Sequence, residues 1–322
     1  MVGPPDVLGR ERCEATPGEG WVPEHALREA TQMIAIGKIG IWFAHSAMSI
    51  AESVAFARKV EACGYGALWV PEAIGREPFV HLAYLASQTS TLVLATGIAN
   101  IWARDAVTMA AAQKTLVEIS GDRFLLGLGV SHAPLVEGVR GHHYHRPLTY
   151  MRNYLEKMAT ARYDAPAPTE NPPIVLAALR QRMLALARDK ADGAHPYFVP
   201  PAHTRRARQI LGPGRLLAPA QAVILETDPA QARAAAREYM KTYVPRLPNY
   251  KNNLLELGYT EADFANGCSD RLVDDIVAWG DVATIKARLQ EHYDAGADHV
   301  CILPLSATGR LPNMATVEML AP

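Results

Sequence analysis

Histidine dominates the positions of this 322-residue chain at which chemistry could take place. His45, His132 and His195 each lie in or just after a short apolar run, and Glu72 is the one acidic residue at a comparable position. An imidazole with a pKa near 6.5 can donate or accept a proton near neutral pH. Metal-dependent hydrolases, by contrast, combine several carboxylates with histidine. The pattern therefore predicts proton transfer beside a bound organic molecule, and no metal centre.

A second group of histidines, His142, His143 and His145, looks at first like a ligand set. Arginines flank it on both sides and no carboxylate stands nearby at helical spacing, so we do not expect it to bind a metal. The chain has no GxxxxGK[ST] phosphate loop, and GLGVSH (127–132) lacks the third glycine of a dinucleotide fingerprint. The sequence therefore does not support a P-loop or a Rossmann-type site.

Apolar runs alternate with amphipathic segments from Lys38 onward, a pattern that predicts a parallel sheet with helical connections. The eight predicted strands are residues 38–43, 66–70, 91–100, 123–130, 173–179, 194–199, 216–226 and 298–305. Eight units in series favour a closed (β/α)8 TIM barrel with insertions, although another α/β fold is the alternative. In such a barrel the reactive side chains lie on loops at the C-terminal ends of the strands.

Helix-start signals support this reading of the chain. Ser49 with Glu52 forms a capping box, Asp105 can cap a long helix, and Asp228 precedes a proline at the first helical position. Residues 130–147 form an irregular run long enough to be functional. The insertion at 245–253, with Tyr243, Tyr250 and Asn252 in or beside it, is expected to close the pocket, or else to be a subunit interface or a surface loop.

The composition of the chain limits the classes of molecule that it can be expected to bind. The chain is 49% hydrophobic and 20% charged, with a formal net charge of −1, so no basic field attracts nucleic acid or an anionic membrane. Four widely spaced cysteines suggest reduced thiols, and no apolar stretch suits a signal peptide or a membrane span. We expect a cytoplasmic protein with one domain over residues 34–322. Residues 1–33, rich in Pro, Gly and charge, are expected to be a flexible extension.

Five ordered segments carry a family resemblance: ALWVPEA (67–73), LVLATGIAN (92–100), QKTLVEISGDRFLLGLGVSH (113–132), MLALARDKADG (183–193) and DAGADHVCILPL (294–305). Each segment alone occurs too widely to identify a family, but the five in this order do identify one. From about Lys38 to Leu305 the chain resembles the bacterial luciferase-like monooxygenase superfamily, and within it the oxidoreductases that use the deazaflavin coenzyme F420.

The resemblance implies roles for particular residues. It implies a non-prolyl cis peptide at Gly97–Ile98 behind the deazaflavin ring, with Glu72 near the pyrimidine side of that ring. His132 stands where related enzymes carry a glutamate acid, and His45 is a second candidate acid. The family's phosphate-binding glycine pair is replaced by Leu179 and Arg180, so either the Arg180 guanidinium binds the phosphate or phosphate binding is weakened. His195 would lie near the phosphate-bearing side chain of the coenzyme.

The expected cofactor-binding residues are Glu72, Gly97, Ile98, Asn100, Val130, Ala178, Leu179, Arg180 and His195. The first hypothesis is hydride transfer between F420 and a small organic substrate, by reduction of C=C, C=N or C=O or by oxidation of an alcohol, with His132 handling the proton. The alternative is an FMN-dependent monooxygenase that uses oxygen. A third reading is a barrel that binds a ligand without catalysis. The resemblance also implies a homodimer.

Overall fold

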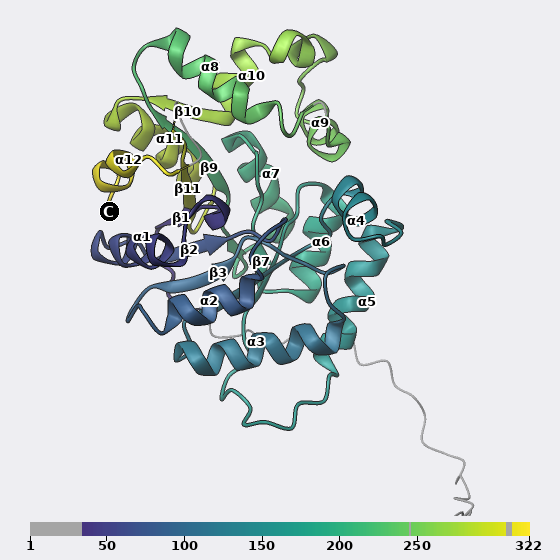
Figure 1. Ribbon diagram of the computed structural model, residues 1–322. Helices are drawn as coiled ribbons and strands as arrows, with labels where there is room; N and C mark the ends of the chain where they lie inside the picture. Colours follow the sequence, from purple (N-terminus) through teal and green to yellow (C-terminus); the bar gives the residue numbers. More distant parts are fainter. Residues whose placement is uncertain (1–33, 245, 307–310) are drawn as a thin grey trace, which may run out of the picture.

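A ring of parallel strands forms the centre of the molecule, and helices surround it (Figure 1). The structure is a computed structural model that describes residues 34–244, 246–306 and 311–322, so the predicted extension 1–33 lies outside the described residues. The strands are β1 Ile39–Trp42, β2 Ala67–Val70, β3 Val93–Thr96, β4 Ala99–Asn100, β5 Phe124–Gly129, β6 Ile174–Leu176, β7 Gly193–Ala194, β8 Leu216–Leu217, β9 Ala220–Leu225, β10 Val277–Gly280 and β11 Val300–Pro304.

The pairing of these strands closes a barrel. From β1 the order runs through β2, β3, β5, β6 and β7 to β8, and on the other side β1 pairs with β11, which pairs with β9. Only two residues, Ala218 and Pro219, separate β8 from β9, so these two segments are one strand of the ring. Likewise β3 and β4 are two halves of one strand. The ring therefore has the eight predicted strands.

The strand β10 was not predicted. It pairs in parallel with the C-terminal part of β9, with Val277 opposite Ala222 and Gly280 opposite Leu225. At this end β9 thus has β11 on one side and β10 on the other. The additional strand belongs to the insertion that precedes the last helix–strand unit, and it explains why the sheet contains more than eight segments.

Three helices begin where the predicted capping residues place them. The helices are α1 Ile50–Ala62, α2 Pro78–Ala86, α3 Ala106–Ser120, α4 Ala133–Gly138, α5 Pro147–Ala159, α6 Gln181–Lys190, α7 Pro201–Leu211, α8 Pro229–Met240, α9 Pro248–Leu255, α10 Asp270–Ile276, α11 Val282–Asp294 and α12 Met314–Met319, with 3-10 turns η1 His45–Ala47 and η2 Glu261–Gly267. Ser49 and Glu52 form both bonds of the capping box, and Asp105 and Asp228 cap α3 and α8. Among the helices of the described segments, none has the length and apolar character that crossing a membrane requires.

Two segments are more regular than the sequence suggested. The run at 130–147 contains the short helix α4, and the insertion at 245–253 contains most of α9. In Figure 1, α4 lies below α9 on the same side of the molecule. Both insertions therefore present helices, rather than open loops, on this side of the barrel.

Alternation along the strands produces two apolar cores. In β2, Leu68 and Val70 belong to the core between sheet and helices, whereas Ala67 and Trp69 belong to the core that fills the barrel. Successive side chains of a strand point to opposite faces, which explains the division. The barrel interior is packed, so a ligand must bind at its mouth, where the loops after the strands meet.

Candidate active site at the barrel mouth

The third strand of the ring is interrupted at Gly97 and Ile98, between β3 and β4. The peptide bond that joins these two residues is cis, as the resemblance implied. The indole Nε1 of Trp42, at the end of β1, donates a hydrogen bond to the Gly97 carbonyl at 2.8 Å. A Cβ atom at position 97 would lie 2.7 Å from that same nitrogen. Only glycine fits here without displacement of the tryptophan.

Glu72, in the loop after β2, binds the segment that follows the interruption. Its backbone N–H donates to the Ile98 carbonyl at 3.1 Å, and its carboxylate accepts from the Asn100 amide at 2.8 Å. Arg104 donates to both carboxylate oxygens at 2.9 Å, and Arg140 approaches one of them at 3.3 Å. The Glu72 side chain is only 6% exposed. Its carboxylate therefore fixes the local backbone and is already shared by two guanidinium groups.

Asn100 connects this segment to the neighbouring strand. Its Oδ1 accepts from the Trp102 backbone N–H at 3.0 Å, and the Trp102 indole donates to the Val130 carbonyl at 3.0 Å. The Asn100 side chain is fully buried, and its Nδ2 has no hydrogen-bond partner in the described part of the chain. Buried donors are normally satisfied, so this one is a candidate contact for a ligand oxygen.

Aromatic ring contacts run around the mouth from His132 back to the interrupted strand. The His132 ring lies 5.5 Å from that of Tyr250, which lies 6.4 Å from Tyr197, and Tyr197 lies 5.0 Å from Trp42, centroid to centroid. Trp42 then donates to Gly97, as described above. His132 and Gly97, predicted from separate parts of the sequence, thus lie at the two ends of one aromatic wall.

His132 is the titratable imidazole on this wall. It stands at the position before α4, and its side chain makes no hydrogen bond with another described residue. Burial lowers the pKa of His132 below its ordinary value near 6.5. A largely desolvated imidazole without a fixed partner can form a hydrogen bond to a ligand and exchange a proton with it.

Three tyrosines continue the wall and bond to one another. The Tyr197 hydroxyl lies 2.8 Å from that of Tyr243 and accepts from that of Tyr239 at 3.0 Å. Burial raises the pKa of Tyr197 and of Tyr239 well above the ordinary value. These phenols therefore stay protonated at neutral pH, and they give the mouth neutral hydroxyl groups in an apolar surrounding.

The structure does not bring His45 to this wall. Its Nδ1 lies 3.1 Å from Nε2 of His81 in α2, and its ring packs edge-on against Phe56 in α1. Burial, followed by the charges of His81 and Arg76, lowers the pKa of His45 to about 3. His45 is therefore a neutral residue between the barrel and its first two helices, and a catalytic role for it stays a prediction.

His195 lies inside the barrel. Its ring stacks on Trp69 with centroids 4.3 Å apart, and its Nδ1 lies 2.7 Å from the Ala218 carbonyl oxygen. The residue is 1% exposed, and burial lowers its pKa to about 4. A contact with the phosphate-bearing part of a coenzyme stays a prediction, and this position in the core makes His195 part of the floor beneath the mouth.

Arg180 lies at the start of α6 and points to the insertion. Its Nε donates to Oε1 of Glu256, directly after α9, at 2.6 Å. The preceding residues Ala178 and Leu179 are buried, and the Leu179 carbonyl accepts from Nε2 of His203 at 2.6 Å. This corner therefore contains an exposed guanidinium that already pairs with a carboxylate.

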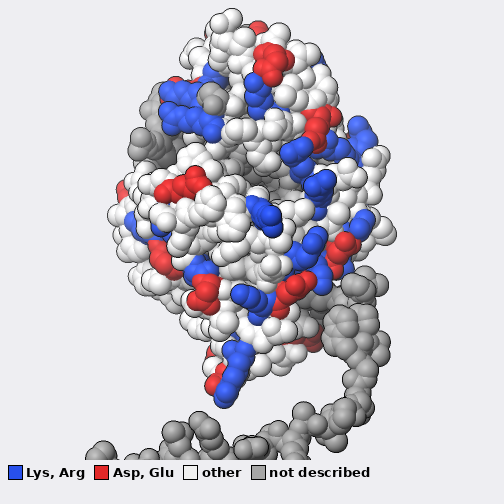
Figure 2. Space-filling view, turned by 90° about the vertical axis from the view of Figure 1, so that its right-hand side faces the viewer, with Lys and Arg blue, Asp and Glu red and all other residues white. Residues whose placement is uncertain are grey.

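Figure 2 shows the face on which α4, α6 and α9 lie; it is hollowed, and Lys and Arg side chains lie beside the hollow. A cavity of about 490 Å³ next to Glu72 is lined by residues 72–77 and by Ala103, Arg104, Val139, Arg140 and His142. Within the described residues, no group of three or more His, Cys, Asp or Glu side chains is arranged to hold a metal ion.

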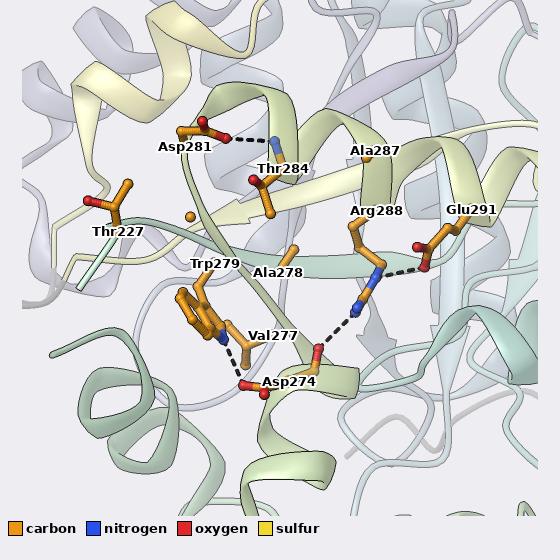
Figure 3. A pocket seen from close by; sticks show the side chains of 11 residues that line it. Thr227, Asp274, Val277, Ala278, Trp279, Asp281, Thr284, Ala287, Arg288 and Glu291 are labelled. Atoms are coloured by element: carbon orange, nitrogen blue, oxygen red, sulfur yellow. Dashed lines mark hydrogen bonds and ion pairs between the residues drawn. The ribbon is translucent and has the colours of Figure 1, made fainter. Parts of the chain in front are cut away.

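A second cavity, of about 600 Å³, lies away from these residues, between β10 and α11 (Figure 3). Its acidic side chains have structural partners: Asp281 accepts from the Thr284 amide, Asp274 from the Trp279 indole, and Glu291 pairs with Arg288. The charged groups that line it serve to cap α11 and to hold β10 in place.

Sequence reasoning missed several residues of the mouth. Sequence patterns assign Trp42 only to a strand and give no sign that Tyr239 or Arg104 takes part in the site. A signal was available for Trp42, because a large aromatic residue at the C-terminal end of a barrel strand lies at the mouth. The Arg104–Glu72 pair spans 32 positions, and no local pattern predicts it.

Comparisons with known proteins agree with this geometry. Residues 33–299 match the model of the family described as luciferase-like monooxygenase. The chain is 26% identical over 333 residues to a Mycobacterium tuberculosis protein named "Putative coenzyme F420-dependent oxidoreductase", with 84% of this chain and 94% of that protein covered.

Two solved structures share the fold at low sequence identity. One is an F420-dependent secondary alcohol dehydrogenase with an F420–acetone adduct (TM-score 0.70, 13% identity, 88% of this chain and 96% of that chain). The other is the oxygenating constituent of 3,6-diketocamphane monooxygenase of Pseudomonas putida with FMN (TM-score 0.65, 14% identity, the same coverage). Together with the family match, they agree with a luciferase-like barrel. The chain belongs to the luciferase-like monooxygenase family.

Proposed function

We propose that this oxidoreductase transfers a hydride between coenzyme F420 and a small organic substrate, by reduction of a C=C, C=N or C=O bond or by oxidation of an alcohol. The observation that carries the proposal is the aromatic wall from His132 through Tyr250 and Tyr197 to Trp42 and Gly97. It offers a largely apolar, aromatic surface with one titratable imidazole, and within the described residues no group of three or more His, Cys, Asp or Glu side chains is arranged to hold a metal ion. The description of the M. tuberculosis relative supports the choice of coenzyme.

The residues at the mouth fit a deazaflavin. The unsatisfied Nδ2 of Asn100 can donate to a carbonyl oxygen on the edge of a ring. Because the Trp102 amide fixes Oδ1, the free atom is the donor nitrogen and not the oxygen. Glu72 would act here as a positioning residue, since it holds the backbone at Ile98 and Asn100, directly after Gly97.

When bound, F420 supplies two-electron hydride chemistry, so the protein must position the reactants and handle one proton. His132 would hold that proton and pass it to the substrate heteroatom or carbon during reduction, or accept it during oxidation. Tyr250, on the insertion helix, packs beside His132 and would exclude water from it. Val130 would help to place His132, because its carbonyl accepts a hydrogen bond from the Trp102 indole two residues before His132.

The phosphate-bearing part of the coenzyme would lie where α6 begins. Helix N-termini attract anions, and Ala178 and Leu179 lead the chain into that turn. The Arg180 guanidinium can supply a charge-assisted hydrogen bond in place of the missing glycine amides. His195 would support this part of the site from below, because its neutral ring stacks on Trp69 in the floor of the mouth.

An FMN-dependent monooxygenase is the second candidate, because the P. putida structure of the same fold contains FMN. The two candidates share the ring surface and the phosphate corner and differ in whether oxygen is consumed. Fold similarity alone does not separate them.

The deciding experiment is a titration of the purified chain with F420 and with FMN, each oxidised and reduced, followed by absorbance. We expect F420 to bind more tightly than FMN, and reduced F420 to be oxidised by an acceptor substrate without oxygen uptake. Tight FMN binding together with oxygen consumption would establish the monooxygenase instead. Failure of both cofactors to bind would favour a ligand-binding barrel without this chemistry.

A further inference from the structure

Two arginines from neighbouring helices share the carboxylate of Glu256, the residue directly after α9. Nη2 of Arg180, at the start of α6, lies 2.5 Å from Oε1 of Glu256, and Nη1 of Arg206, in α7, lies 3.5 Å from Oε2. Arg206 also donates to Oδ1 of Asn253, in α9, at 2.6 Å and to the Leu179 carbonyl at 3.4 Å. The three charged groups come from segments far apart in sequence and meet at the start of α6, where the phosphate of the coenzyme is proposed to lie.

The electrostatics of this cluster favour an anion. Burial lowers the pKa of Arg206, the Glu256 carboxylate opposes that shift, and the Arg180 guanidinium adds to it. The two guanidinium groups therefore repel each other, and Glu256 compensates for that repulsion with a single charge. A phosphate group presents charged acceptor oxygens in a tetrahedral arrangement, two of them free in a diester and three in a monoester, so a single phosphate can accept hydrogen bonds from both arginines.

The position of Glu256 also matters for the opposite side of the mouth. Glu256 directly follows α9 as its C-cap residue, and α9 carries Tyr250, whose ring lies beside His132. If Arg180 and Arg206 bind Glu256 less tightly, the helix α9, which contributes Tyr250 to the aromatic wall, is therefore affected.

We propose that Glu256 occupies an anion subsite formed by Arg180 and Arg206, and that the phosphate group of a bound ligand competes with it for these two arginines. Binding of the phosphate releases the C-terminal end of α9 and so couples recognition of the cofactor's phosphate to the position of Tyr250. This inference rests on the proposed function in taking the ligand to carry a phosphate, but it does not require that ligand to be a deazaflavin.

The test compares ligands that differ in the phosphate. Wild-type protein and the Glu256→Gln variant are titrated with F420 and its phosphate-free chromophore fragment, and with FMN and riboflavin. Glu261→Gln is the matched control, because Glu261 is an exposed carboxylate that also pairs with α9, through Lys251 at 2.6 Å. Exposed ion pairs contribute modestly, so we expect the phosphate-bearing ligands to bind Glu256→Gln about two- to fivefold more tightly. The phosphate-free ligands and the control variant should show no change.

A second measurement requires no cofactor. Inorganic phosphate should speed amide hydrogen exchange in the last turn of α9 in the wild type and have no effect in Glu256→Gln. Equal changes for both members of a ligand pair, weaker binding by Glu256→Gln, or exchange in α9 that ignores phosphate would each overturn the proposal. If only the FMN pair shows the phosphate-dependent gain, the F420 assignment fails while this inference stands. If no cofactor binds, the exchange measurement alone decides.

Discussion

Both terminal nitrogens of Arg104 donate hydrogen bonds to the carboxylate oxygens of Glu72, at 2.9 Å each. The same carboxylate accepts from the backbone amide of Asn100, so this ion pair fixes the strand segment directly after Gly97 and Ile98. The Arg104 side chain is 12% exposed, which makes the pair nearly dry. A charged pair in such a position costs much more to break than a surface pair does.

We expect Glu72→Gln to lower the free energy of unfolding by about 3 kcal/mol, because it removes the buried counter-ion of Arg104 and leaves that guanidinium only the exposed carboxylate of Glu77. Denaturant unfolding measures the loss, and cofactor affinity should fall with it. The control is Glu77→Gln, since Glu77 also contacts Arg104 but its side chain is 44% exposed. Equal effects of the two substitutions would show that burial of the Glu72 pair does not matter.

Substitution of Gly97 tests the ring surface. In Gly97→Ala the new methyl group would lie 2.7 Å from Trp42 Nε1 and 3.2 Å from Trp69 Cβ, so the indole must move and its hydrogen bond to residue 97 is lost. Overpacking of this kind costs about 1–3 kcal/mol of stability. Trp42 contributes to the intrinsic fluorescence, so a shifted emission spectrum together with cofactor binding weakened about tenfold or more is the expected result.

Gly138→Ala provides the comparison for that variant, because a Cβ at position 138 meets no atom within 4 Å. It should change neither the emission spectrum nor the affinity. Unaltered cofactor binding by Gly97→Ala would remove the interrupted strand from the proposed site.

The arrangement of strands and helices followed from local patterns. Asp105 and Asp228 cap the helices that their positions predict, because the capping contact lies within three residues along the chain. The strand β10 escaped prediction because its four residues, Val277–Gly280, form a short apolar run next to a polar segment, and only pairing with β9 makes them a strand. Local periodicity carries no information on that pairing.

The site was predictable only in part for a similar reason. A strand end identifies which residues can reach the mouth, but the direction of a side chain depends on packing. His45 follows β1 and turns to His81 and Phe56, while His132 follows β5 and faces Tyr250. The partner of Arg180 lies 76 positions away, so the sequence left open whether that guanidinium was free.

His132 should control the pH dependence of the reaction. Burial lowers its pKa, so in the reductive direction the rate should rise as the pH falls and level off below pH 6.5. Loss of a general acid typically costs at least about 100-fold in kcat, so we expect that loss in His132→Gln, with cofactor affinity unchanged. The profile of the variant should also lose the step below pH 6.5.

His143→Gln, in the same loop but with a side chain that is 82% exposed, is the matched control and should behave like the wild type. If His132→Gln keeps the wild-type profile, the proton comes from another group, and the hydroxyl groups of Tyr197 and Tyr243 become the next candidates.

Stability should fall in mild acid because buried histidines resist protonation. Burial lowers the pKa of His195, His203 and His299 to about 4 each, and that of His292 to about 3. Each ring is neutral in the folded chain but binds a proton near pH 6.5 once unfolded, so the unfolded state holds more protons between about pH 4 and 6.5. The free energy of unfolding is therefore greatest above pH 6.5 and decreases as the pH falls toward 4.

His195→Phe isolates one of these groups, because phenylalanine can keep the stacking on Trp69 and cannot titrate. Whatever its effect at pH 7.5, the variant should lose less stability between pH 6 and 5 than the wild type does. Removal of one bound proton from the difference changes the slope by at most about 1.4 kcal/mol per pH unit. Denaturant unfolding at several pH values measures that slope. Parallel curves for variant and wild type would mean that His195 titrates alike in the folded and unfolded chain, which burial in the barrel interior does not permit.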